Sequence, residues 1–456
     1  MQDQISNFRA TLDRHPISGF QWRLLLLLTL LLITDGYDAL GLGYVVPALA
    51  QEWNVDKVLF GPVFSANLLG LTFGSLLVTP LADRIGIRVV LIGCVSVYGL
   101  LTLTTALVNS IEGLVWVRFI CGIGMGGAMP CAMALMSEYS PPRQRTLMVT
   151  LAACGFSLGG AMGGFVAAAL IDRFGWQSVF LTGGIAPLML LPALLLFLPE
   201  SLPRLLKDGA PFVRLRALTR RMKLDWEPLP VWDAQSKASQ FPSRFAVVEL
   251  FRNGYARPTL MIWATFFMAL ILLYFMVSWL PTLLKQNGVN LSEANLITSL
   301  FLFAGTIGAG AMSYFADRVT NKAKLLCVVL AAAGLFTFLI GLFHDNKVVM
   351  IGLVFATGMC VIGGQLTLNA FSSNFYPAHC RATGAGWALG VGRFGSILGP
   401  LFGSLFIGMQ MPVSQIFILS AIPAVLAALF ISQVKAPKAK DEVREWKGQV
   451  KESSPL

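Results

Sequence analysis

The sequence predicts an all-α polytopic membrane protein of twelve transmembrane helices, arranged as two pseudo-symmetric six-helix bundles. Hydrophobic residues make up 56% of the 456 residues and charged residues only 12%, a balance typical of proteins with several membrane spans. The apolar runs are long enough to cross a hydrocarbon core of about 30 Å as helices, and they lack the alternating pattern of a membrane barrel. A short motif after the second run recurs after the eighth, which indicates two related halves.

Six apolar runs form the predicted N-terminal bundle, residues 1–198. The first run holds leucines before an Asp-Gly-Tyr-Asp stretch, and Pro47 is expected to close it because proline donates no backbone hydrogen bond. The other runs are of similar length and are separated by short polar segments. The six spans are predicted near residues 22–47, 58–81, 89–109, 112–137, 145–170 and 175–198.

A polar stretch, residues 199–257, is predicted to link the two halves on the cytoplasmic side. Within it, residues 212–223 place apolar residues on one side and basic residues on the other at helical spacing. This basic helix either lies on an anionic inner leaflet or joins the halves with its charges in water. Neither alternative requires a soluble domain.

Six more apolar runs form the predicted C-terminal bundle, residues 258–434, followed by a charged cytoplasmic tail, residues 435–456. The motif Leu-Ala-Asp-Arg at 81–84 recurs as Phe-Ala-Asp-Arg at 315–318. Both copies follow the second span of their half, so we expect two parallel halves with a binding site near the midplane between them. The six spans are predicted near residues 258–284, 293–315, 324–343, 347–374, 381–407 and 413–433.

The positive charges predict the orientation in the membrane. The formal net charge is +11, but most Lys and Arg residues gather in loops of one side, and only Lys57, Arg173, Lys285 and Lys347 fall in the predicted outer loops. This bias predicts an inner-membrane protein with both termini in the cytoplasm. The expected partners are therefore the lipid bilayer and a transported solute, not nucleic acid, and the chain is expected to work as a monomer.

No group of residues indicates an enzyme, a metal site or a cofactor site. The seven cysteines lie in or beside the spans, without the spacing of a metal site or a disulfide framework. Glycine runs in the fifth and eleventh spans follow no strand, so we interpret them as helix-packing surfaces rather than phosphate loops. The glycines of the fifth span are Gly155, Gly159, Gly160, Gly163 and Gly164.

Two carboxylates in the first span are the strongest candidates for function. Counting from Arg23, Asp35 lies about 18 Å into the membrane at the helical rise, and Asp38 shares its helix face at a spacing of three residues. An acid at that depth usually faces a polar cavity or a partner. Because a buried Asp can change protonation near neutral pH, we predict that Asp35, Asp38 or both carry the coupling proton. The alternative is that one of them only neutralises a buried arginine.

Two arginines also lie within predicted spans. Arg393 is about 18 Å deep when counted from Arg381, and Arg118 lies nearer the outside. Either guanidinium could hold a substrate carboxylate through its planar donors. The alternative for each is a structural pair with an acid or with backbone carbonyls, and for Arg118 the sequence favours neither reading.

Charged residues at the predicted cytoplasmic ends of the helices are candidates for gating. Acids and arginines gather there in both halves, and such pairs could latch the inner face and break when the halves rock. The alternative, orientation in the membrane plus helix capping, explains the arginines but not the paired acids. The candidates are Asp83, Arg84, Arg88, Glu138, Arg143, Arg145, Asp317, Arg318 and Arg381.

Several motifs together resemble one family of transporters. The loop 74–88 and the sequence Pro-Glu-Ser-Leu-Pro-Arg at 199–204 resemble signatures of the major facilitator superfamily. More specific are Asp-Gly-Tyr-Asp at 35–38, the glycine-rich segment 118–130 and the segment 376–395. These three are similar to the aromatic acid:proton symporter branch of that superfamily.

The resemblance implies import of a benzoate, a hydroxybenzoate or a related carboxylate with protons by alternating access. It also supports Arg393 as the substrate cation, in agreement with its depth. Four further residues could line the pocket, the rings by stacking and the amide by reading a ring hydroxyl: Tyr37, Trp279, Trp387 and Gln365. Two departures from the family pattern are Cys131, where relatives often have Asn, and Lys322, in a second loop that lacks the glycine of the first.

Two other functions remain open at the level of sequence. The same fold could export an organic anion or a drug, and net uptake with alkalinisation of the medium separates import from export. The chain could also be a membrane-embedded sensor that binds aromatic acids without moving them, and counterflow in liposomes tests that reading.

Overall fold

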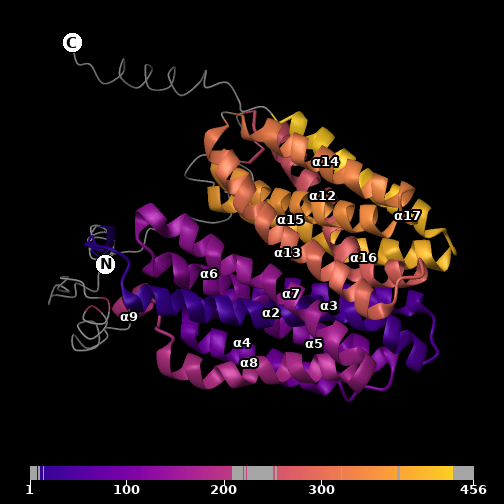
Figure 1. Cartoon of the computed structure of the whole chain (residues 1–456). Coiled ribbons are helices and arrows are strands. Elements are labelled where there is room, and N and C mark those ends of the chain that lie inside the picture. Colours follow the sequence, from indigo (N-terminus) through magenta and orange to yellow (C-terminus); the bar gives the residue numbers. More distant parts are fainter. Residues whose placement is uncertain are drawn as a thin grey trace, which may run out of the picture.

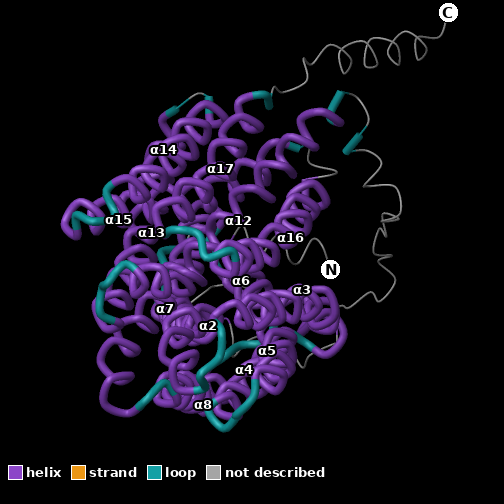
Figure 2. Tube along the Cα trace, turned by 90° about the vertical axis from the view of Figure 1, so that its right-hand side faces the viewer, coloured by secondary structure: helices purple, strands orange, loops and turns teal. Residues whose placement is uncertain are grey.

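The computed structural model confirms the predicted fold class. Within the described part of the chain it is all-helical, with twelve helical segments long and apolar enough to cross a membrane. They form two bundles that lie against each other (Figure 1), and within each bundle short loops join successive helices (Figure 2). The structure describes residues 8, 11–13, 15–207, 219, 222, 250–251, 254–319, 321–376 and 381–434.

The N-terminal bundle contains six spans, the fourth of which is built from two helices. α5 ends at Gly126 and α6 begins at Ala128, so Gly127 breaks this span. Short 3-10 turns precede the second and fifth spans, and a short helix follows the sixth. The helices are α2 (Gly19–Glu52), α3 (Phe60–Ile85), α4 (Ile87–Thr105), α5 (Ile111–Gly126), α6 (Ala128–Tyr139), α7 (Arg145–Phe174), α8 (Gln177–Phe197) and α9 (Leu202–Lys207).

The C-terminal bundle also contains six spans, each a single helix. Asparagine side chains cap three of them: Asn290, Asn321 and Asn346 accept hydrogen bonds from backbone N–H groups of the first turn, at 2.8 to 3.2 Å. The helices are α12 (Ala256–Gln286), α13 (Leu291–Arg318), α14 (Lys322–Leu342), α15 (Lys347–Phe375), α16 (Arg381–Gly408) and α17 (Val413–Ser432).

Helix α2 differs from its prediction at its C-terminal end. Pro47 was expected to close the first span, but the helix continues through it to Glu52. A proline inside a membrane helix is tolerated when neighbouring groups satisfy the freed backbone. Pro47 leaves the Gly43 carbonyl, four residues earlier, without its helical donor. The extra turn contacts the other bundle, because Lys285 donates to the Pro47 carbonyl at 3.4 Å and to the Gln51 side chain at 3.2 Å.

The two halves repeat the same helix pairs. In the N-terminal bundle α2 packs on α7, α3 on α5 and α4 on α8; in the C-terminal bundle α12 packs on α16, α13 on α15 and α14 on α17. In each half these are the first and fifth, second and fourth, and third and sixth spans. The pseudo-symmetry predicted from the repeated loop motif is therefore confirmed.

The two copies of that loop motif are built differently. The first is a one-residue break at Gly86, whose φ of 103° favours glycine. The second has no glycine, and the side chain of Asn321 caps α14 by accepting from the Lys324 N–H at 3.0 Å. The second copy of the motif thus has an asparagine cap where the first copy has a glycine.

The bundles touch through α2 and α12, α3 and α16, and α7 and α13. Besides the bond from Lys285 to the Pro47 carbonyl, three serine bonds between the bundles join Ser65 to the Ile397 carbonyl at 2.8 Å, Ser292 to the Ala168 carbonyl at 2.7 Å and Ser404 to the Val58 carbonyl at 2.6 Å. All three lie toward the end of the spans where α2 finishes and α3 begins. We call this end the contact end.

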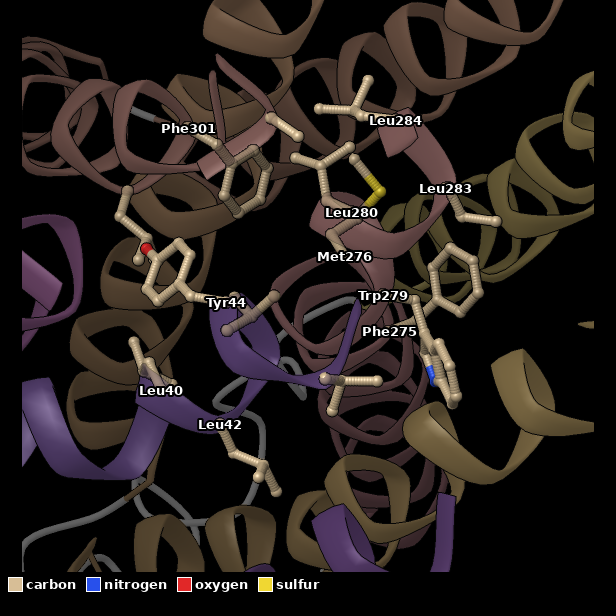
Figure 3. Packing of buried hydrophobic residues seen from close by; sticks show 14 of the residues in the cluster. Leu40, Leu42, Tyr44, Phe275, Met276, Trp279, Leu280, Leu283, Leu284 and Phe301 are labelled. Carbon is tan, nitrogen blue, oxygen red and sulfur yellow. The ribbon is translucent and has the colours of Figure 1, made fainter. Parts of the chain in front are cut away.

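One hydrophobic cluster crosses the interface at the contact end. Leu40 and Tyr44 of α2 and Met276 and Leu280 of α12 belong to it (Figure 3). Gly43 allows the close approach, because a Cβ there would lie 2.6 Å from the Val277 carbonyl oxygen.

The linker and tail are largely outside the described residues. Of the predicted basic helix 212–223, only Thr219 and Met222 are described, both as helical. The tail 435–456 also lies outside the described residues.

Candidate functional site

Asp38 and Arg118 form a fully buried ion pair inside the N-terminal bundle. One guanidinium nitrogen of Arg118 lies 3.0 and 3.1 Å from the two Asp38 oxygens, and neither side chain is exposed. Arg118 also donates to the Thr105 hydroxyl at 3.3 Å and lies over the Phe180 ring, 4.6 Å from its centroid. This geometry corresponds to the second of the two alternatives for Arg118, a structural pair with an acid.

Asp38 receives further hydrogen bonds from the same bundle. The Thr102 hydroxyl donates to its Oδ1 at 2.8 Å and the Cys121 thiol donates to its Oδ2 at 3.3 Å. Asp38 and Arg118 therefore form an ion pair whose partners all belong to the N-terminal bundle.

Asp35, one helical turn earlier, has a different environment. It is 2% exposed, and its Oδ1 has no hydrogen-bond partner among the described residues. The charges close enough to act on it are those of Asp38 and Arg393. A buried carboxylate without donors is costly, since leaving one polar group unsatisfied costs about 1–3 kcal/mol and more when it is charged.

Arg393 lies on α16 of the other bundle and is half-buried. Its charge attracts Asp35 across the interface, yet no direct ion pair or guanidinium hydrogen bond of Arg393 occurs in the part of the chain that the structure describes. Five guanidinium donors are thus available to an anion. Of the two predicted substrate cations, Arg393 is the one whose donors are not already used.

The helix register places Arg393 level with the middle of α3. α3 and α16 run antiparallel, and Ser65 bonds to the carbonyl of Ile397. One turn further along both helices, Arg393 comes level with Leu68 and Leu69. Asp35 and Arg393 therefore lie on opposite sides of the same interface.

A pocket opens at this level between the bundles. It is lined by residues of α2, α3 and α12, among them Ala39, Leu40, Phe64, Leu68 and Val277. Ala39 is one turn beyond Asp35 on the same face of α2. Its polar lining residues are Asn67, Tyr274 and Ser278.

The structure separates the four predicted aromatic and amide residues. Tyr37 points into the N-terminal bundle, where its hydroxyl donates to the Val179 carbonyl at 3.0 Å. Trp279 is buried beside the pocket, 5.5 Å from the Phe64 ring, and its Nε1 donates to the Pro400 carbonyl at 2.8 Å.

The other two lie outside the pocket lining. Trp387 is 47% exposed and stacks on Trp263 at 5.7 Å. Gln365 of α15 donates to Asn369 at 3.3 Å, and its Oε1 has no hydrogen-bond partner among the described residues. The substrate roles of these residues remain predictions.

Several of the predicted gating residues contact their own bundle. Glu138 accepts from the Ser201 hydroxyl at 3.0 Å and the Leu202 N–H at 3.2 Å, which caps α9. Arg143 donates to the His15 carbonyl at 3.0 Å. These are capping and loop contacts, as in the alternative that assigns these residues to membrane orientation and helix capping.

The remaining gating residues differ in how much the structure describes. Arg88 donates to the Leu195 carbonyl, Arg318 lies 3.9 Å from the centroid of the Tyr314 ring, Arg84 is exposed, and Arg145 is half-buried. The side chains of Asp83, Asp317 and Arg381 lie outside the described residues. The gating role itself stays a prediction.

The glycines of α7 pack against α2, as predicted. A Cβ on Gly159 would lie 1.9 Å from the Ile33 carbonyl oxygen, and one on Gly155 would lie 2.7 Å from that of Thr29. From the other side, a Cβ on Gly36 would lie 1.9 Å from the Phe156 carbonyl oxygen. The glycine between the two acids is therefore needed for the close contact of α2 with α7.

Sequence reasoning missed the thiol that bonds to Asp38 and the polar residues that line the pocket. Cys121 was not among the predicted site residues, although its spacing of three residues from Arg118 places both on one helix face. Asn67, Tyr274 and Ser278 are single polar residues within apolar runs, so no periodic signal distinguished them.

Comparisons with known proteins agree on one family. Residues 26–400 match the family described as Major Facilitator Superfamily, and residues 262–455 match it a second time. The 4-hydroxybenzoate transporter PcaK of Pseudomonas aeruginosa is 39% identical over 92% of this chain and 93% of its own length. The gallate transporter of Pseudomonas putida is 38% identical over 92% and 93%, and the benzoate transport protein of Acinetobacter baylyi is 32% identical over 93% and 92%.

Solved structures share the fold at low sequence identity. The D-xylose-proton symporter superposes with a TM-score of 0.72 at 16% identity, over 92% of this chain and 100% of that one. The inward-open xylose transporter XylE of E. coli also gives 0.72, at 17% identity, over 94% and 99%.

Proposed function

This chain belongs to the Major Facilitator Superfamily and, within it, to the aromatic acid transporters, and from that premise we propose that it imports a benzoate-like or hydroxybenzoate-like carboxylate together with protons. Membership confirms the resemblance found in the motifs and makes the chain a multi-pass membrane transporter rather than an enzyme. The substrate class rests on the named relatives, and the coupling rests on the site.

The observation that carries the proposal is the pair Asp35 and Arg393. They lie on different bundles, on either side of one interface, and both have polar atoms without partners among the described residues. Asp38 and Arg118, by contrast, neutralise each other within one bundle. Only the first pair is divided by a movement of the bundles.

Charge balance explains why a proton accompanies the substrate. With no substrate, ionised Asp35 balances the charge of Arg393. When a substrate carboxylate takes the donors of Arg393, an ionised Asp35 is left buried and uncompensated, which is strongly unfavourable. Protonation of Asp35 removes that charge, so the site is neutral both empty and loaded. This gives one proton for each monovalent carboxylate.

The arrangement of the bundle contacts supports a transport cycle by alternating access. The serine bonds and the α2–α12 packing lie at the contact end, beyond the pocket. We place this end on the outer side, with both termini in the cytoplasm, because the predicted outer loops are poor in Lys and Arg. The contacts between the bundles then lie on the outer side of the site, and in the proposed cycle they part when the bundles rock. One chain contains the whole site, consistent with a functional monomer.

The test is uptake of labelled 4-hydroxybenzoate into proteoliposomes, with an acidic outside and with equal pH on both sides. The wild type accumulates substrate only with the pH gradient and raises the external pH on substrate addition. Asp35→Asn mimics the protonated acid, so it retains counterflow exchange but loses gradient-driven accumulation by at least tenfold. Arg173→Gln, a charge change in a predicted outer loop, is the control and leaves both readouts unchanged.

Each competing function has its own outcome. If Asp35→Asn still accumulates substrate with the gradient, the proton is carried elsewhere. Net efflux of substrate driven by proton entry from the acidic outside indicates an exporter, and binding without counterflow indicates a sensor.

A further inference from the structure

The pocket between the bundles is mostly apolar but has polar groups on two sides. Leu40, Phe64 and Val277 supply apolar walls from three helices. Asn67 of α3 lies on one side and Ser278 of α12 on the other. Apolar walls with a few placed polar groups are the usual lining of a site for an aromatic ring that carries a polar substituent.

Asn67 is the unusual member of this lining. It is 4% exposed, and its carboxamide Oδ1 has no hydrogen-bond partner among the described residues. Buried polar atoms almost always have partners, so an orphan that lines a pocket indicates a missing one. The side chain of Ser278, also 4% exposed, has no hydrogen bond to the described residues either.

Asn67 lies where a ring substituent of a substrate held by Arg393 is expected. Arg393 comes level with Leu68 by the register of α3 and α16, and Leu68 itself lines the pocket. Toward the contact end, the pocket is closed by the approach of Gly43 to α12. A carboxylate held by Arg393 therefore directs its ring toward Phe64, and a ring hydroxyl comes near Asn67 or Ser278.

We propose that Asn67 is a specificity residue that accepts a hydrogen bond from a ring hydroxyl of the substrate, with Ser278 as a second partner. The transporter then selects hydroxylated benzoates over benzoate itself. A site with an unpaired buried acceptor disfavours the analogue that lacks the hydroxyl, because that acceptor stays unsatisfied. This inference rests on the proposed function, since it requires an aromatic carboxylate in the pocket.

The experiment compares binding of benzoate, 4-methylbenzoate, 3-hydroxybenzoate and 4-hydroxybenzoate to the purified protein in detergent. The wild type prefers at least one hydroxybenzoate over benzoate by about tenfold or more, and the methyl analogue gains nothing from its similar size. Asn67→Leu reduces that preference by about tenfold, through weaker binding of the hydroxylated acid. Binding of benzoate stays the same or improves.

The matched control is Asn295→Leu. Asn295 is also buried with an unpartnered amide, but it lies on α13 where α13 contacts α7, so its replacement leaves the preference unchanged. Ser278→Ala provides a second variant if Asn67→Leu does not fold, and it lowers the preference by a smaller factor.

The outcomes distinguish this inference from the proposed function. Equal binding of benzoate and the hydroxybenzoates by the wild type, or a preference that survives Asn67→Leu, overturns the inference while the proposed function stands. A preference that is lost in Gln365→Leu instead assigns the role to Gln365. If none of the four acids binds, both fail.

Discussion

Two carboxylates one helical turn apart on α2 show how environment separates roles. Asp38 faces its own bundle, where an arginine, a hydroxyl and a thiol surround it. Asp35 has an orphan oxygen, and an arginine on the opposite bundle acts on it. The first charge has its partners within its own bundle, whereas the second has its nearest opposite charge on the other bundle. The proposed coupling therefore assigns the proton to Asp35 rather than to Asp38.

The largest effect is expected from removing Arg118. Arg118→Leu leaves Asp38 buried without its counter-ion and lowers the free energy of unfolding by about 3–5 kcal/mol. Thermal and denaturant unfolding in detergent measure it. The double variant Asp38→Asn with Arg118→Leu recovers most of the loss. Equal instability of single and double variants contradicts a paired role. Arg173→Gln, at the exposed end of α7, is the control and changes stability by less than about 1 kcal/mol.

A smaller effect is expected from Arg393, and on binding rather than on stability. Arg393→Gln removes charged donors to the substrate carboxylate, which is worth about 1.5–3 kcal/mol or roughly 10- to 100-fold in Kd. Arg393→Lys keeps the positive charge but lacks the planar set of donors, so its Kd lies between those of the wild type and Arg393→Gln. Titration calorimetry with 4-hydroxybenzoate measures this. An unchanged Kd in Arg393→Gln excludes Arg393 as the anchor.

The smallest effect tests where Tyr37 belongs. Although it lies between the two acids, its hydroxyl donates within the N-terminal bundle, so Tyr37→Phe costs about 0.5–1.5 kcal/mol of stability and leaves gradient-driven uptake intact. Unfolding and uptake are measured on the same preparation. Loss of uptake without loss of stability would instead assign Tyr37 a role in the transport site.

The fold was predictable because each span carries its own signal. A long apolar run must form a helix in lipid, and the repeated Asp-Arg motif marked the two halves, so the spans and their symmetry followed from local sequence. The course of α2 beyond Pro47 did not, because the group that uses the proline carbonyl, Lys285, lies on another helix.

The site was predictable only in its charged members. Asp35, Asp38, Arg118 and Arg393 are conspicuous because charge is rare inside a membrane. Their pairing was not predictable, since Asp38 and Arg118 are 80 residues apart and two acids and two arginines can pair in more than one way. Asn67 lies on a third helix, and only the packing of both bundles reveals that its amide oxygen is an orphan.

The three serine bonds at the contact end make the seam between the bundles easy to open. Each serine donates to a backbone carbonyl, and a helical carbonyl has a second lone pair for its own helix. After separation the hydroxyl can turn back to a carbonyl of its own helix, so no charge and no orphan is left in the membrane. At about 1 kcal/mol each, the three bonds add about 3 kcal/mol to the contact, beside the bonds of Lys285 and the packing of α2 on α12.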